Sequence, residues 1–275
     1  MKTLYLVPKI KIDGNLDLKN LSNLCKINLE KKVVSEVVIY FNYRKSKLSD
    51  IFNISIKSND TKIKKVIIKK SNHHFENLGR NWSSGILKIF GEVGSFAGAE
   101  MSGGEIRISG SCLNYLGSKM IGGKIFISGN AGDNVGSSLF GEKIGMSGGF
   151  IYIKKNAGDY LGSHLRRGII CINGDIGSYG CSNMIAGSVL ISGRFGNHFC
   201  LGMKRGTVLI RSDNKYFDNN QCFKDCGTQE LNFFSFFKKE LGDKTFFDSL
   251  KSMKFKKMVG DRSNFGLGEV LIVKK

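Results

Sequence analysis

Glycine recurs in this sequence at a fixed interval. Of the 35 glycines, 28 lie between Gly85 and Gly206. A glycine precedes each of seven short β-like segments, and the starts follow a 19-residue period with one longer step, from Gly123 to Gly149. The seven starts are Gly85, Gly104, Gly123, Gly149, Gly168, Gly187 and Gly206. A repeat this short cannot bury a core alone, so the spacing predicts stacked coils, with a seven-residue insertion inside residues 137–148.

The segment after each start has the pattern of a strand with one buried face. The seven segments read ILKIF, EIRIS, KIFIS, FIYIK, IICIN, SVLIS and TVLIR, and their second and fourth residues are always Ile, Val or Leu. Since alternate residues of a strand share a face, these positions predict a continuous core. Its first row comprises Leu87, Ile106, Ile125, Ile151, Ile170, Val189 and Val208. The other three positions accept polar residues, which predicts an open outward face.

A second apolar row and the remaining glycines complete each repeat. The row consists of Met101, Met120, Met146, Leu165, Met184 and Met203. Methionine fills irregular gaps, so we interpret this row as core at a corner of the coil. Glycines at three further fixed offsets within the repeat predict corners, where the chain turns with positive φ or passes close to its neighbour.

These patterns divide the chain into three parts. Residues 1–80 carry strand-like runs and predict a small α/β cap over the first coil, since an uncapped stack exposes strand edges. Residues 81–212 form the predicted parallel β-helix. In residues 213–275, apolar spacing predicts one or two amphipathic helices before a final strand, GEVLIV. We expect these helices to pack on the stack, and a docking face for another subunit is the alternative.

Composition indicates a cytoplasmic protein outside the membrane. No stretch approaches the roughly 18 apolar residues of a membrane span, and the first residues lack the apolar run of a secretory signal. The seven cysteines lack zinc spacing, which favours reduced structural thiols and no metal. The formal charge is +19, with +10 in residues 1–84, and attracts polyanions, acidic proteins or glutamate-rich ligands; a role in solubility alone is the alternative. Without a stacking platform or a groove-reading helix, we expect no nucleic-acid partner.

Catalytic patterns are missing from the sequence. No GxxxxGK[ST] occurs, and the repeated glycines open no convincing helix, which argues against nucleotide binding. The histidines, His73, His74, His164 and His198, form no metal motif, and no carboxylate pair accompanies them. A hexapeptide-repeat acyltransferase is the enzymatic alternative, although a repeat with one strong strand fits that template poorly. We therefore predict no catalytic residues.

Two basic pairs are candidates for ligand binding. Arg166 and Arg167 end one repeat, and Lys204 and Arg205 occupy the equivalent positions two repeats later. Stacked coils are separated by roughly 4.8 Å, so the pairs should lie about 10 Å apart on one edge. This arrangement suits an extended anionic chain or an acidic partner. A merely solvated basic edge is the alternative.

Several segments resemble a known family. The strings GGEIRISGSCLNYLGSKMIGGKIFISGNAGDNVGS and AGDYLGSHLRRGIICINGDIGSYGCSNMIAGSVLISG resemble the GXGXG domain of glutamate synthase large subunits and of the C subunit of formylmethanofuran dehydrogenase. The flanks VSEVVIYFNYRKSKLSDIFNI and VGDRSNFGLGEVLIV resemble those of the latter family, and the catalytic domains of glutamate synthase are absent. The resemblance implies a mainly β fold, a right-handed parallel β-helix.

What the resemblance implies about function depends on the branch of the family. The helical tail favours the bacterial formyltransferase/hydrolase complex over the tungsten or molybdenum enzyme of methanogens. The chain would then be a non-catalytic partner of amidohydrolase-like and formyltransferase-like subunits, without a metal, redox centre or tightly bound cofactor. Because methanofuran- or methylofuran-type carriers bear glutamate-rich tails, the resemblance makes such a tail a candidate ligand of the basic edge. A free-standing acyltransferase stays the alternative of another class.

Overall fold

The seven repeat segments form seven strands. The computed structural model describes residues 2–26, 30–57, 64–211, 215–217, 220–230 and 254–274. The repeat strands are β8 (Ile86–Gly91), β9 (Glu105–Ile108), β10 (Lys124–Ile127), β11 (Ser147–Ile153), β12 (Arg167–Ile172), β13 (Ser188–Ile191) and β14 (Arg205–Ile210). Each includes most of its predicted pentapeptide, because strictly alternating apolar residues favour a half-buried strand.

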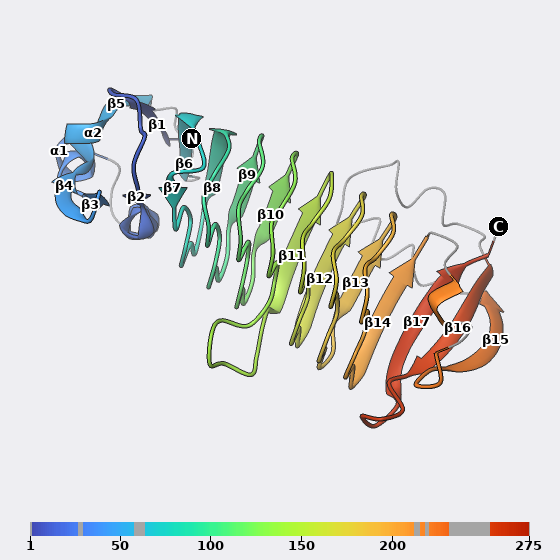
Figure 1. Cartoon of the computed structure of the whole chain (residues 1–275). Coiled ribbons are helices and arrows are strands. Elements are labelled where there is room, and N and C mark those ends of the chain that lie inside the picture. The colour runs from blue at the N-terminus through green and yellow to red at the C-terminus, as the bar shows by residue number, and fades with distance from the viewer. Residues whose placement is uncertain are drawn as a thin grey trace.

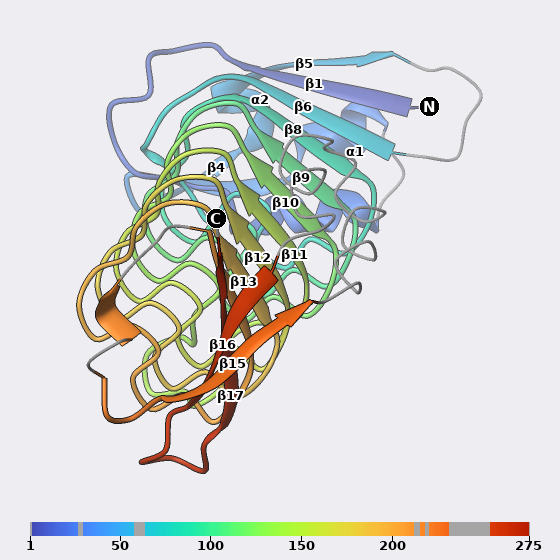
Figure 2. The same ribbon diagram turned by 90° about the vertical axis from the view of Figure 1, so that its right-hand side faces the viewer.

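Neighbouring repeat strands pair in parallel and in the predicted register. Ile125 of β10 lies opposite Ile106 of β9, its equivalent in the preceding repeat, and opposite Ile151 of β11, its equivalent beyond the insertion. The inserted residues form a loop that projects from the stack between β10 and β11 (Figure 1). Viewed along the stack, the coils nest over one another with their strands on one side (Figure 2). The repeat period therefore sets the stacking.

Three strands extend the sheet at each end. At the amino-terminal end, β6 (Lys64–Ser71) pairs in parallel with β8, β1 (Lys2–Pro8) pairs in parallel with β6, and β5 (Phe52–Lys57) pairs antiparallel with β1. At the other end, β17 (Leu267–Val273) is parallel to β14, whereas β16 (Lys254–Gly260) and β15 (Lys224–Glu230) follow antiparallel. The described residues thus build one open, mixed sheet of 13 strands.

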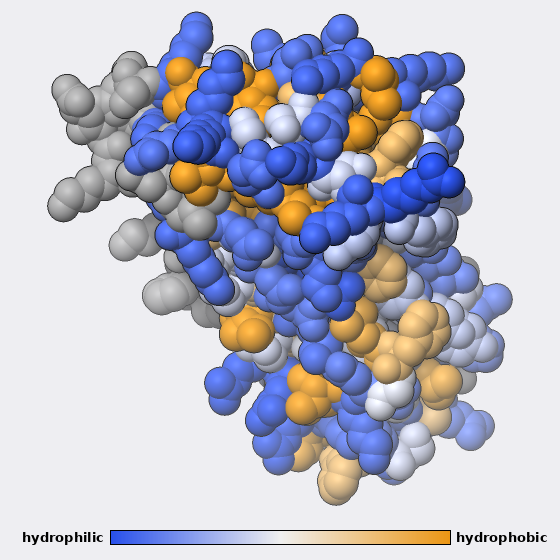
Figure 3. Space-filling model, turned by 90° about the vertical axis from the view of Figure 1, so that its left-hand side faces the viewer, coloured by the Kyte–Doolittle hydropathy of each residue, from blue (hydrophilic) through white to orange (hydrophobic). Residues whose placement is uncertain are grey.

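The rest of the amino-terminal region covers the first coil. A small sheet contains β2 (Leu16–Asp17), β3 (Val38–Phe41), β4 (Arg44–Lys47) and β7 (Phe75–Glu76). The short helices are α1 (Lys31–Ser35), α2 (Leu48–Ile51) and η1 (Lys19–Cys25), with η2 (Lys215–Phe217) after the last coil. Seen from this end, the surface is mostly hydrophilic, with scattered apolar patches (Figure 3). Because β1, β5 and β6 belong to the main sheet, the predicted cap is partly a continuation of that sheet.

The helices predicted in the carboxy-terminal part fall mainly on residues 231–253, outside the described residues, whereas its predicted final strand is β17. No helix in the described part of the chain has the length and apolar character that a membrane crossing requires. The proposed boundaries at residues 80 and 212 stay predictions.

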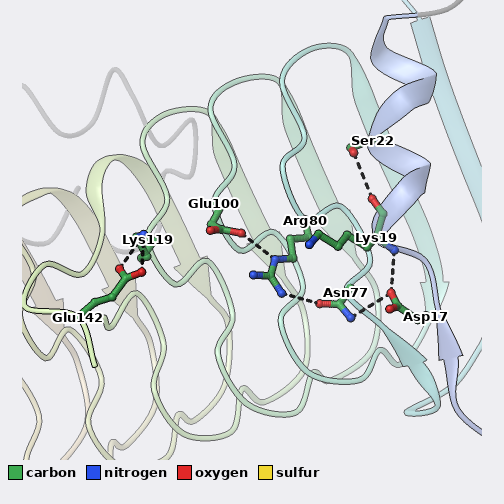
Figure 4. A network of polar contacts seen from close by, with 8 residues as sticks. All are labelled: Asp17, Lys19, Ser22, Asn77, Arg80, Glu100, Lys119 and Glu142. Carbon is green, nitrogen blue, oxygen red and sulfur yellow. Dashed lines mark hydrogen bonds and ion pairs between the residues drawn. The ribbon is translucent and has the colours of Figure 1, made fainter. Parts of the chain in front are cut away.

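Polar contacts join the amino-terminal region to the first coils. The side chain of Asn77 donates to Asp17 over 3.0 Å, and Arg80 contacts both Asn77 and, over 2.7 Å, Glu100 of the next coil (Figure 4). Farther along, Lys119 forms an ion pair of 2.6 Å with Glu142. This ion pair connects the inserted loop to the preceding coil (Figure 4).

Both predicted apolar rows are buried. Every residue from Leu87 to Val208 in the first row, and every residue from Met101 to Met203 in the second, has no exposed surface. Burying a side chain of this size stabilises the fold by about 1.5–3 kcal/mol, so each member of the two rows contributes to the stability of the stack. The interpretation of the methionines as core is confirmed.

The expectation of an open outward face is wrong for the later strands. Cys171, Leu190 and Leu209 occupy the third position of their pentapeptides and are almost fully buried. They belong to a second apolar cluster on the other side of the sheet, together with Phe150, Phe255, Leu271 and Val273. The physical reason is compositional: the third position is Lys88 in β8 and Arg107 in β9, but it becomes aromatic in β10 and β11 and small or aliphatic from β12 onward.

Side-chain oxygens satisfy backbone donors at a corner that has no strand. The amide oxygen of Asn114 accepts the backbone N–H of Asp133 on the next coil, the carboxylate of Asp133 accepts that of Asp159, and Asp159 accepts that of Ser178. These bonds are 2.7–2.9 Å long. Each of these repeats thereby supplies a side-chain acceptor for a backbone N–H of its neighbour at an exposed corner.

At one corner of the stack, a larger residue at the corner position is matched by a smaller residue at the core position that faces it. Gly117 has a φ of 60°, and a Cβ there would lie 2.5 Å from the Cδ1 atom of Ile151. Three coils of the stack later, the equivalent corner position is Cys181, whose φ is 58°. The core position that faces it by the same periodicity is Val208, which lacks the Cδ1 atom. From this periodicity we infer that the missing methyl group leaves the space for the Cys181 thiol.

The exchange predicts a coupling between two substitutions. Val208→Ile should destabilise the fold by about 1–3 kcal/mol, because the added methyl group collides with the Cys181 side chain. Adding Cys181→Gly should recover most of this loss, since glycine also tolerates the positive φ. Urea unfolding of the two single variants and the double variant forms the test. Additive effects of the two substitutions would contradict the proposed packing.

Candidate functional site

The four basic residues selected from the sequence line one pocket. Its volume is about 360 Å³. The lining residues are Arg166, Arg167, Ile185, Ala186, Lys204, Arg205 and Phe265. Both basic pairs therefore face the same cavity, and an apolar pair from the coil between them completes its wall.

Strand register brings the basic pairs together. Arg167 is the first residue of β12 and Arg205 is the first residue of β14. The pairings of β12 with β13 and of β13 with β14 place both at the same level as Ala186. Arg205 is in turn opposite Leu267 at the start of β17. Equal offsets within the repeat thus become neighbouring places on one edge.

Buried anchors fix the backbone beneath these exposed side chains. Each basic pair follows a residue of the second apolar row, Leu165 or Met203. The backbone N–H of Arg166 donates to the carbonyl of Met146 over 2.9 Å, and that of Lys204 donates to the carbonyl of Met184 over 2.8 Å. The starting points of the cationic side chains are therefore rigid, which lowers the entropy lost on binding an anion.

The pocket has a positive field that the described residues do not neutralise. None of the ion pairs formed within the described part of the chain includes Arg166, Arg167, Lys204 or Arg205. Burial, followed by the charge of Lys204, lowers the pKa of the nearby His164. His164 is thus neutral at pH 7 and adds no further charge. The arrangement can hold several carboxylate or phosphate groups along one edge.

Phe265 is a wall residue that the sequence reasoning missed. It lies in the loop between β16 and β17 with a φ of 72° and is 78% exposed. Asp261 holds this loop by accepting the backbone N–H groups of Gly202 and Ser263, and Asn264 donates to the carbonyl of Gly202 over 2.6 Å. The available signal was the turn composition of DRSNFG just before a strand that resumes the stack.

A histidine and two serines lie next to the basic edge. Ser163 contacts the Nδ1 atom of His164 over 3.0 Å, and the Ser182 hydroxyl lies 3.2 Å from that of Ser163. Both serines are buried in the corner of their coils. A buried hydroxyl cannot reach a dissolved substrate, so this group has the geometry of a structural ladder.

The cysteines and remaining histidines lie apart from the pocket. Cys112 and Cys171 are buried, and burial raises the pKa of both thiols, so they are protonated and unreactive at neutral pH. His198 stacks on Tyr179, whereas the rings of His73 and His74 are tilted by 41° with their centres 4.2 Å apart. No cluster of three metal-ligating side chains occurs within the described residues.

Comparison with known proteins places the chain among proteins of similar sequence and structure. A family model described as the GXGXG motif matches residues 31–233. A solved structure, that of the formyltransferase/hydrolase complex (FhcABCD) from Methylorubrum extorquens in complex with methylofuran, contains a chain with a TM-score of 0.85. The identity is 29%, over 98% of this chain and 100% of that one. The comparison with curated proteins gave no match.

Proposed function

The chain belongs to the GXGXG motif family, and on that premise we propose that it is a structural subunit of a formyltransferase/hydrolase complex in one-carbon metabolism. The observation that carries the proposal is the likeness to a chain of such a complex over the full length of both chains, at 29% identity. The place proposed within that complex is that of its C subunit.

In this proposal the coils form a right-handed parallel β-helix that acts as a scaffold. Its partners are an amidohydrolase-like subunit, which hydrolyses the formyl group, and a formyltransferase-like subunit, which transfers it. The chain itself supplies no catalytic residue, and its place is the cytoplasm. A stack of rigid coils suits this role because its two apolar rows hold the surface residues at fixed positions.

Native mass spectrometry tests the proposal. The protein is purified from its source cells through a tag on this chain. We expect recovery with one amidohydrolase-like and one formyltransferase-like chain. Recovery of a lone homotrimer would contradict the proposal and favour a solenoid acyltransferase.

The proposal extends to the carrier of the formyl group. We propose that the pocket of Arg166, Arg167, Lys204 and Arg205 contacts the glutamate-rich tail of a methanofuran- or methylofuran-type carrier. Support comes from two cationic pairs that flank an apolar step, so that they match carboxylates spaced along an extended chain. The carrier would be held by several weak ion pairs and not by a buried cofactor site.

Replacing the four basic residues with serine should weaken carrier binding about 30-fold. Four exposed ion pairs at about 0.5 kcal/mol each total about 2 kcal/mol, and 1.4 kcal/mol corresponds to a tenfold change in Kd. Calorimetry of the intact complex with a polyglutamate peptide measures the change. The control removes four other exposed charges, those of Lys31, Lys32, Lys154 and Lys155. Equal affinity of both variants in an intact complex would refute the carrier contact.

A further inference from the structure

The five strands at the amino-terminal end of the main sheet carry almost only positive charge. In β1, β5, β6, β8 and β9 the single acidic residue is Glu105. The basic residues are Lys2, Lys57, Lys64, Lys65, Lys69, Lys70, Lys88 and Arg107. This excess accounts for much of the charge that the sequence places in its first third.

Strand alternation sends several of these charges to the outward face. Leu4 and Leu6 of β1, and Val66 and Ile68 of β6, belong to the core between the coils. The residues between them therefore point away from the stack. Lys57, Lys69 and Arg107 lie in this outward set, and all three are exposed. The basic face is thus a surface of the sheet and not part of its core.

Aromatic rings of the same face lie beneath the cations. The Nζ atoms of Lys57 and Lys69 lie 5.9 and 6.0 Å from the ring centre of Tyr5. Lys88 lies 4.9 Å from the ring of Phe90, which is 41% exposed. Cation–π contacts of this kind restrict flexible lysine side chains. The face therefore presents its charges at defined places.

The same arrangement continues across the next strands. The guanidinium of Arg107 lies 4.5 Å from the ring centre of Phe126 and also pairs with Glu105. Register places Ile67, Lys88, Arg107 and Phe126 in one row across β6, β8, β9 and β10. Arg, Tyr and Phe are enriched in protein interfaces, whereas Lys is depleted there, so Tyr5, Phe90 and Arg107 are the residues of this face that resemble an interface. The row thus places two cations, Lys88 and Arg107, between two apolar residues, Ile67 and Phe126.

We propose that this outward face, defined by Tyr5, Lys57, Lys69, Lys88, Phe90 and Arg107, docks an acidic surface of another protein subunit. The inference rests on the proposed function, because it assigns the face to a partner in the same complex. Charge complementarity selects an acidic partner. A single-stranded nucleic acid fits less well, because its bases need free aromatic faces and cations already cover these rings.

The test neutralises the face in the tagged, full-length chain. The variant combines Lys57→Gln, Lys69→Gln, Lys88→Gln and Arg107→Gln. We expect native mass spectrometry at about 150 mM ammonium acetate, near physiological screening, to show at least a tenfold loss of one partner chain. A control with Lys31, Lys32, Lys154 and Lys155 changed to Gln should keep that partner. Equal thermal midpoints of both variants would show that the fold is intact.

Three outcomes contradict the inference in distinguishable ways. Full assembly of the face variant contradicts the docking face alone. Full assembly combined with lost binding of a short single-stranded DNA, measured by fluorescence anisotropy, assigns the face to nucleic acid instead. Absence of partner chains from the wild-type sample contradicts the proposed function and the docking face together.

Discussion

Replacing Gly148 with alanine should lower the free energy of unfolding by about 3 kcal/mol or more. A Cβ atom on this residue would lie far inside van der Waals contact with the carbonyl oxygen of Ile121 and 3.0 Å from its carbonyl carbon. Neither atom belongs to a flexible side chain. The backbone on either side is fixed, because Ile121 donates to Met101 and Ser147 donates to Met120. The coils cannot separate without losing these bonds.

A neighbouring glycine provides the control. Gly141 lies in the inserted loop, has a φ of 76° and has no atom within 4 Å of its Cβ position. Gly141→Ala should therefore cost only about 1 kcal/mol of left-handed strain. Urea unfolding followed by circular dichroism compares the two variants. Equal midpoints would refute the assignment of Gly148 to a close approach between coils.

Replacing Asp261 with alanine should destabilise the protein by about 2–4 kcal/mol, because part-buried donors on Gly202 and Ser263 would lose a charged acceptor. Asp261 is buried and accepts bonds of 2.6–3.0 Å from the backbone of Gly202 and from the backbone and hydroxyl of Ser263. These bonds fasten the loop of Phe265 to the last coil. Urea unfolding measures the loss, and Ser263→Ala, which removes one hydroxyl, should cost about 1 kcal/mol.

Asp261 should also make stability depend on pH. Burial alone would raise the pKa of its carboxyl, but hydrogen bonds from Ser263, Gly202 and Cys222 outweigh burial and lower the pKa below its usual value. Because the folded pKa is depressed, the carboxylate stabilises the fold above its unfolded pKa of about 3.9. This contribution is lost as pH falls through the folded pKa. Asp261→Asn should therefore reduce the loss of folding stability at acidic pH. An unchanged dependence of stability on acidic pH would contradict this role of Asp261.

The strands and their register were predictable because one sequence signal repeats. An isolated segment such as IICIN fits a buried strand or part of a helix. Seven segments with a 19-residue period and one longer step favour stacked parallel strands, since stacking lets every segment bury its apolar pair. The mainly β class and the two buried rows are confirmed on this basis. The handedness of the coils stays a prediction.

Features that occur once in the chain were not predictable. The segment KVIIKK does not indicate that β6 continues the main sheet. A strand at the end of a stack has the same local pattern as a strand in a separate cap. The second cluster around Phe150 and Leu209 depends on a composition change at one repeat position. Phe265 reaches the basic pocket only because β17 pairs with β14, a contact between segments that are far apart in the sequence.

The candidate site was partly predictable for the same reason. Equal offsets in two repeats indicated that Arg166 and Lys204 share an edge, and both line one pocket. The charge of that pocket follows from sequence, whereas its shape depends on Ile185 and Phe265. Its ligand stays a proposal, because a basic edge has the same sequence pattern whether it binds an anion or only water.

Between the antiparallel strands at its two ends, the sheet can become longer or shorter only by whole coils. Each parallel strand between β5 and β15 can pair with another parallel strand on either side. The antiparallel strands at the two ends do not continue this parallel pairing. Insertion or loss of one repeat would change the length by one step of about 4.8 Å and leave both ends as they are. The distance between the basic face near β8 and the basic pocket near β13 is therefore counted in whole coils. The number of repeats between these two surfaces therefore sets their separation.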